Sequence, residues 1–184
     1  MRVATRNSST GGPPPKTRSE DVPDVLVDCH LRMREVTRLA AELASRPDAS
    51  LEDVRDVASK VDRYFTVALP LHEADEEVSL FPRLLLRVPT LGPTIAALRD
   101  DHAAHAQRVA AVLAICQELK ASKESDDSLR RELAATAVSL AEAWRPHLAT
   151  EERDVFPWVK TALSEEERVT IRDEMRGRRA HLPR

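Results

Sequence analysis

The sequence has little of what sheets, membrane spans and disulfide frameworks require. Its 184 residues include only four Gly and two cysteines, and aromatic residues make up 3% of the chain. No apolar run approaches the roughly 18 residues that a membrane-spanning helix needs. Cys29 and Cys116 lie far apart and outside any Cys-x-x-Cys spacing, which argues against a disulfide framework or a thiolate metal site. We therefore expect a cytoplasmic protein without membrane contact.

The chain also lacks an excess of charge of one sign. It has 28 Lys and Arg against 31 Asp and Glu, for a formal net charge of -3, and the two signs are interspersed. No basic surface is therefore predicted that would bind nucleic acid or an anionic membrane. What the chain does have is 42% apolar and 32% charged residues, rich in helix formers. This composition, at a length that fits one domain, predicts an all-α fold.

The pattern along the chain divides it into three parts. Residues 1–19 combine Ser, Thr, Gly and a run of three prolines, which predicts a flexible tail. Residues 20–163 carry four apolar seams with alternating spacings of three and four, separated by Arg46-Pro47-Asp48, by 88–93 and by 122–128. Four long helices with short links favour an up-down-up-down bundle. Residues 164–184 are predicted to form a short fifth helix, opened by a capping box at Ser164 and Glu167, and a tail.

An internal repeat carries the chemistry of the sequence. His72-Glu-Ala-Asp-Glu76-Glu77-Val-Ser-Leu-Phe-Pro matches His147-Leu-Ala-Thr-Glu151-Glu152-Arg-Asp-Val-Phe-Pro, so that both segments have the pattern H-x3-E-E-x3-F-P. On a helix, a His and a Glu four residues apart differ by about 40° in direction and by ~6 Å along the axis. Each repeat therefore places an imidazole and a carboxylate where they can share a metal ion.

The first and third helices repeat as well, because Asp28-x-His30 matches Asp100-x-His102. The two copies predict two helical hairpins related by a pseudo-twofold axis, each with two histidines and one glutamate on its seam. Six such groups in an apolar interior would each lose several kcal/mol of solvation unless they are paired. Metal ions remove that cost, and imidazole with carboxylate but no thiolate suits iron or manganese better than structural zinc.

These motifs resemble the hemerythrin-like, or HHE cation-binding, family over about residues 22–163. The resemblance implies a four-helix bundle with two non-haem iron ions, bridged by glutamates. Manganese is the alternative metal. The implied ligands are His30, His72, Glu76, His102, His147 and Glu151. Two positions differ from the oxygen carriers of the family: Ala106 stands where they have a second histidine of helix three, and Glu152 where they have an aspartate. A sensing, storage or redox role is therefore favoured over reversible oxygen transport.

Three further residues are candidates near the site. His105 lies on the third seam and is an additional ligand, a hydrogen-bond donor beside the metals or a satisfied core histidine. Glu73, like Glu77, points away from the seam, which usually means a solvated face, although the resemblance implies that Glu73 ligates in some relatives. Tyr64 lies two turns before His72 and either donates a hydrogen bond to a bound oxygen species or is a core residue with its hydroxyl at the rim.

Three functions are open at this point. The first is a di-iron protein that binds or reduces dioxygen, peroxide or nitric oxide, with or without turnover. The second is an iron or oxygen sensor, or an iron-storage module, that acts on a partner protein through metal-dependent folding. The third is a purely structural bundle without metal.

Overall fold

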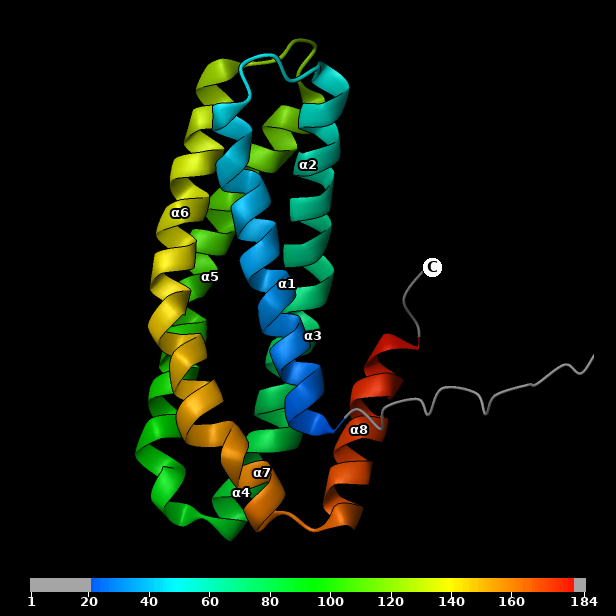
Figure 1. Cartoon of the computed structure of the whole chain (residues 1–184), viewed down its shortest axis with the longest axis vertical. Helices are drawn as coiled ribbons and strands as arrows, with labels where there is room; N and C mark the ends of the chain where they lie inside the picture. Colours follow the sequence, from blue (N-terminus) through cyan, green and yellow to red (C-terminus); the bar gives the residue numbers. More distant parts are fainter. Residues whose placement is uncertain (1–20, 181–184) are drawn as a thin grey trace, which may run out of the picture.

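The computed structural model describes residues 21–180, which form an all-helical bundle. Four long helical rods run antiparallel to their neighbours along the chain, and a shorter helix lies against one side near the end of the described chain (Figure 1). The predicted all-α, up-down-up-down architecture with a short fifth helix is thus confirmed. The predicted tail, residues 1–19, and the last four residues, 181–184, lie outside the described residues.

Each long rod begins and ends close to where the sequence predicts. The first rod is α1 (Val22–Glu42) and the third is α5 (Gly92–Ala121). The second rod joins α2 (Leu51–Arg63), α3 (Leu69–Ala74) and α4 (Phe81–Arg87), and the fourth joins α6 (Asp127–Thr150) and α7 (Phe156–Ala162). Short 3-10 turns at Leu43–Ser45 and Pro89–Leu91 lie in the links. The fifth helix is α8 (Glu165–Arg179).

Side-chain caps explain where several helices start. Asp21, Ser50 and Ser164 each accept a backbone N–H at the start of α1, α2 and α8, and each is part of a capping box. Asp126 caps α6 by accepting from Ser128 N and Leu129 N. Each cap satisfies N–H groups that have no partner inside the helix, typically worth about 1 kcal/mol. The capping box predicted at Ser164 is therefore present.

The second and fourth rods contain π-helical segments that the sequence pattern did not lead us to expect. They are Tyr64–Ala68, Asp75–Leu80 and Glu151–Val155. In each case the residue just after the segment donates its N–H five residues back, to the carbonyl of Tyr64, Glu76 or Glu151, and the next residue is a proline. A proline has no N–H and its ring crowds the carbonyl four residues earlier, so the wider turn removes that clash.

Two of these π-helical segments begin at or beside the glutamates of the repeat. Pro82 and Pro157, the last residues of the two H-x3-E-E-x3-F-P motifs, each stand six residues after the motif glutamate. The motif therefore encodes a local widening of the helix as well as two candidate metal ligands, and π-bulges of this kind are common at functional sites. Pro146, by contrast, lies inside the regular α-helix α6.

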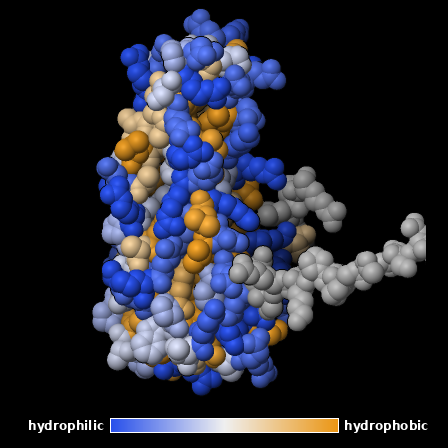
Figure 2. All heavy atoms as spheres, in the orientation of Figure 1, coloured by the Kyte–Doolittle hydropathy of each residue, from blue (hydrophilic) through white to orange (hydrophobic). Residues whose placement is uncertain are grey.

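The apolar core is divided into two clusters along the bundle. One cluster is centred on Val61, Val112, Leu119, Leu133 and Leu140, and the other on Leu26, Phe81, Leu84, Leu98 and Val155. The metal-binding candidates belong to neither cluster, and they lie at or close to the point on each rod where one cluster gives way to the other. The face turned to the viewer in Figure 2 is mostly hydrophilic, with apolar strips along it. Among the described residues, no helix is long and apolar enough to cross a membrane.

Helix α8 packs against α1, α3 and the π-helical segment Asp75–Leu80. The C-terminal end of α8 forms two salt bridges to Asp75, which is fully buried. Arg178 Nη1 lies 2.8 Å and Arg179 Nη2 2.6 Å from its carboxylate. Arg178 also donates to Ser79 Oγ. The fifth helix therefore covers one side of the rod that carries His72 and Glu76.

Candidate metal centre

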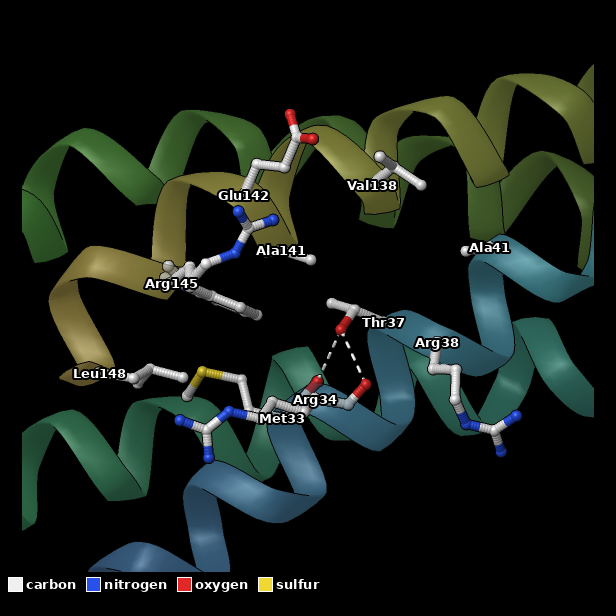
Figure 3. Close-up of a pocket in the computed structure, with 11 residues that line it drawn as sticks. Met33, Arg34, Thr37, Arg38, Ala41, Val138, Ala141, Glu142, Arg145 and Leu148 are labelled. Atoms are coloured by element: carbon white, nitrogen blue, oxygen red, sulfur yellow. Dashed lines mark hydrogen bonds between the residues drawn. The ribbon is translucent and has the colours of Figure 1, made fainter. Parts of the chain in front are cut away.

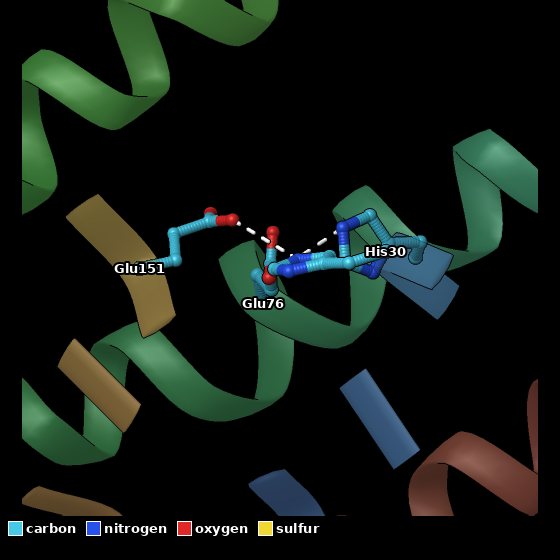
Figure 4. A group of neighbouring side chains, drawn as sticks. His30, Glu76 and Glu151 are labelled. Atoms are coloured by element: carbon cyan, nitrogen blue, oxygen red, sulfur yellow. Dashed lines mark ion pairs between the residues drawn. The ribbon is translucent and has the colours of Figure 1, made fainter. Parts of the chain in front are cut away.

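Each of the four rods contributes one histidine to a single buried cluster. His30 comes from α1, His72 from α3, His102 from α5 and His147 from α6, and none is more than 8% exposed. Glu76 and Glu151 come from the π-helical segments of the second and fourth rods and are both fully buried. Figure 4 shows Glu76 and Glu151 extending toward one another and toward His30. The structure thus brings together all six predicted ligands.

The histidines form two pairs, and each glutamate reaches both. We call His30 with His72 the first pair, and His102 with His147 the second pair. Glu151 Oε2 lies 3.2 Å from His30 Nε2, while its Oε1 lies 3.2 Å from His147 Nε2. Glu76 Oε1 lies 3.6 Å from His72 Nε2, while its Oε2 lies 3.6 Å from His102 Nε2. Each carboxylate therefore offers one oxygen to each pair, as a bridge between two metal ions requires.

Several polar atoms that face one another across this cluster make no hydrogen bond of regular geometry within residues 21–180. These atoms are both carboxylate oxygens of Glu76 and of Glu151 and the Nε2 atoms of His30, His72 and His102. Buried polar groups are almost always hydrogen-bonded, and each orphan costs about 1 to 3 kcal/mol. Ligand atoms of His30, His72, Glu76 and Glu151 lie within 4.8 Å of one another, as do those of His102, His147 and Glu151. The donor set and its spacing therefore fit metal ions.

Burial and mutual contact shift the pKa values of these groups in opposite directions. Burial, together with the neighbouring His30, lowers the pKa of His72 to about 3, so the imidazole is neutral. Burial, with the charge of Glu151, raises the pKa of Glu76 well above its usual value. For Glu151, burial alone would raise the pKa, but the closeness of His147 and His30 outweighs it and lowers the pKa. A neutral imidazole at His72 and an ionised carboxylate at Glu151 are the forms that bind a cation.

Carboxylates on the outer side of the cluster hold three of the four histidines. His30 Nδ1 lies 2.7 Å from Glu152 Oε1, and His102 Nδ1 lies 2.7 Å from Glu77 Oε1. His147 Nδ1 lies 3.3 Å from Asp101 Oδ2. In metal sites, such a contact orients the ring of a ligating histidine and makes the imidazole a better ligand.

The role of Glu77 corrects the expectation that this residue lies on a solvated face. Its side chain is 38% exposed, yet its carboxylate contacts the buried His102 ring. The sequence did carry a signal for this contact, which is the second glutamate of each motif. In the structure, that glutamate contacts the lone histidine of the other hairpin. Glu152 and Asp101 were likewise not recognised as partners of the ligand histidines from sequence.

The three additional candidates lie beside the cluster and not in it. His105 is buried, its ring centroid is 5.4 Å from that of His147, and its Nδ1 has no hydrogen-bond partner in the described part of the chain. Glu73 is half-buried, and burial raises the pKa of its carboxyl. The Tyr64 hydroxyl donates to the backbone carbonyl of Cys29, 3.2 Å away, which fits the expectation of a core tyrosine with its hydroxyl at the rim. None of these three belongs to the groups whose ligand atoms lie within 4.8 Å.

A groove between α1 and α6 approaches the cluster from the side. It has a volume of about 310 Å³ and is lined by Met33, Arg34, Thr37, Trp144 and Leu148 among others (Figure 3). Leu148 follows the ligand His147, and the Trp144 ring stands edge-on to His105 with centroids 6.1 Å apart. The groove is lined by residues close in sequence to His30 and His147, but none of the six candidate ligands lines it.

Comparison with known families decides the classification. The chain matches the Hemerythrin HHE cation binding domain family over residues 21–159. The chain belongs to this family. No curated protein sequence matches it. The HHE match spans all four rods and both copies of the repeat, and the family name describes cation binding, for which the buried His and Glu cluster has suitable donor atoms.

Proposed function

We propose that this HHE domain holds two iron ions, bridged by Glu76 and Glu151, and there binds or reduces a small ligand such as dioxygen, peroxide or nitric oxide. The observation that supports the proposal is the division of each glutamate between the two histidine pairs, with one oxygen 3.2 or 3.6 Å from each. A single ion would need only one pair. Two bound irons would supply electrons and an open position for the ligand.

The donor set supports iron, with manganese as the alternative. All six candidates are imidazoles or carboxylates, and within residues 21–180 neither cysteine belongs to the cluster. Soft thiolates favour zinc and copper(I), whereas imidazole with carboxylate is typical of iron and manganese sites in helical bundles. Both cysteines are free, and burial raises the pKa of each thiol, so neither is poised to act as a thiolate.

The chain's own residues have separate tasks in this proposal. The four histidines and two glutamates hold the ions, while Glu77, Asp101 and Glu152 orient the rings. His105 is the group that we expect to donate to the small ligand, because its Nδ1 is buried and has no other partner. Tyr64 is less suited to that task, since its hydroxyl already donates to the carbonyl of Cys29.

Metal analysis and spectroscopy test the proposal. After iron-replete expression, we expect about two irons per chain and, in air, the visible absorption of a carboxylate-bridged diferric centre. Substitution His72→Ala should remove that absorption and leave the helix content measured by circular dichroism. Fewer than one metal per chain in the wild type would contradict the proposal and favour a structural bundle.

A sensor or storage role remains the second candidate, supported by the unpartnered buried atoms of the cluster. Because a metal stabilises only the state that contains its site, the apoprotein should be less helical or more easily proteolysed than the loaded protein. Turnover separates the two candidates. Reduced protein that consumes more than one equivalent of oxygen, peroxide or nitric oxide in the presence of a reductant acts as an enzyme, whereas strictly stoichiometric oxidation together with metal-dependent folding favours the sensor.

A further inference from the structure

The two hairpins place equivalent residues around the two histidine pairs. His102 follows His30 by 72 residues along the equivalent rods α5 and α1, and both are contacted at Nδ1 by the second glutamate of the other hairpin's motif at 2.7 Å. The residue just before each of these histidines is therefore equivalent too. These residues are Cys29 on α1 and Asp101 on α5, and both are half-buried.

The difference between Cys29 and Asp101 changes the surroundings of His72 and His147, the histidines of the second and fourth rods. Asp101 reaches His147 Nδ1, the ring of the fourth rod, at 3.3 Å. The equivalent ring on the second rod is His72, which is 1% exposed, and its Nδ1 has no hydrogen-bond partner among residues 21–180. Where the second hairpin supplies a carboxylate, the first supplies a neutral thiol, which is a weak hydrogen-bond partner.

The difference has a direct consequence for metal affinity. A carboxylate that accepts the N–H of a ligating histidine fixes the ring and makes it a stronger donor, and loss of such a partner typically weakens metal binding by about 10- to 100-fold. Both rings of the second pair have a carboxylate. In the first pair only His30 has one, and that carboxylate, Glu152, also contacts Arg34 Nη2 at 2.9 Å, which draws part of its charge away from the ring.

We propose that the two metal positions are unequal: the position held by His102 and His147 binds its ion more tightly, because Asp101 orients His147 whereas Cys29 leaves His72 without a partner. The inference rests on the proposed function in that it requires two ions. Asp101 is thus a positioning residue, and position 29 sets the affinity of the weaker site. The chain would then hold one ion at low metal supply and two only at higher supply.

The test is an anaerobic titration of the metal-free full-length protein with ferrous iron, in competition with a chromophoric chelator, repeated with Mn(II). The wild type should bind two ions in two steps. Asp101→Ala should weaken the tighter step by about 10- to 100-fold and leave the other nearly unchanged. Cys29→Asp should strengthen the weaker step, so that the two steps approach one another. His72→Ala should remove the weaker step and His147→Ala the tighter one.

Matched controls separate this effect from general changes in charge or packing. Asp100→Ala removes an exposed carboxylate next to Asp101, and Cys29→Ala removes the thiol without adding an acceptor, so both should leave the two steps unchanged. Repulsion between the two ions also separates the steps, but it does not respond to Asp101. If Cys29→Asp fails to fold by circular dichroism, Cys29→Asn supplies a neutral acceptor at the same position and should strengthen the weaker step to a smaller extent.

The outcomes distinguish the two proposals from one another. A wild type that binds fewer than two ions overturns the proposed function. A wild type that binds two ions, with Asp101→Ala changing neither step or both steps equally, overturns only the inequality of the positions. The inference is also wrong if His147→Ala removes the weaker step instead of the tighter one.

Discussion

The two hairpins of this protein carry the same pattern of two histidines and one glutamate in different surroundings. In the first hairpin, Asp75 is buried and held by two arginines of α8, whereas the equivalent Thr150 of the second hairpin is half-buried and uncharged. Met33 lies in the first hairpin where His105 lies in the second, each three residues after the lone histidine. The candidate ligands are thus the same in the two hairpins, whereas the residues next to them differ. The comparison teaches that the repeat places the candidate ligands, while the residues beside them differ between the two halves of the cluster.

Removal of a shared glutamate should have the largest effect, because it breaks both halves at once. We expect Glu151→Ala to abolish binding of both ions, since its oxygens face His30 and His147, one in each pair. His72→Ala should cost only one ion. Metal content after dialysis, measured by elemental analysis, distinguishes these results. Glu73→Ala is the matched control, because Glu73 lies outside the cluster and should leave both ions bound.

The contact of α8 with Asp75 should stabilise the first hairpin, and the second hairpin has no equivalent contact among the described residues. The double substitution Arg178→Ala and Arg179→Ala leaves the carboxylate of Asp75 buried and unpaired, which should lower the free energy of unfolding by about 3 kcal/mol. Urea unfolding followed by circular dichroism measures it. Thr150→Ala, at the equivalent position, should change stability by less than about 0.5 kcal/mol. Equal effects at the two positions would show that α8 contributes nothing particular to the first hairpin.

Substitution His105→Met makes the two hairpins alike at this position. If His105 donates to the bound ligand, the loss of one hydrogen bond should weaken ligand binding by about tenfold, or ~1.4 kcal/mol, with two ions still bound. Nitric oxide binding to the reduced protein, followed by its absorption spectrum, provides the measurement. The reverse change, Met33→His, serves as a control for altered packing beside the groove. An unchanged affinity in His105→Met would assign His105 to the core.

The smallest effect is expected at Arg34, which contacts Glu152 beside the first pair. The equivalent residue of the second hairpin is Ala106, which has no charge. The Arg34 side chain is 46% exposed, so the ion pair is screened by solvent and should contribute less than about 0.5 kcal/mol. Arg34→Ala should therefore change iron affinity by less than about threefold in the same chelator competition. A loss of tenfold or more would mean that Arg34 holds Glu152 in place.

Much of the fold could be predicted because the apolar seams, capping residues and linkers are local signals. The helix containing His30 ends where Arg46 and Pro47 predict, and α8 begins at the capping box of Ser164. The π-helical segments were not predicted, although a proline six residues after each motif glutamate was a usable signal. The partners of the histidines were also missed, because a carboxylate such as Glu77 contacts a ring 25 residues away through packing that no periodicity describes.

The sequence by itself determined that this chain forms a four-helix bundle and which six side chains meet inside it, because spacings of three and four place residues on one helical face whatever the neighbours are. Only the tertiary structure decided how those side chains divide between two pairs and which histidine lacks a partner. That division depends on the rotation and distance between rods, and these are set by the packing of the whole core, including the π-helical widening and the contact with α8.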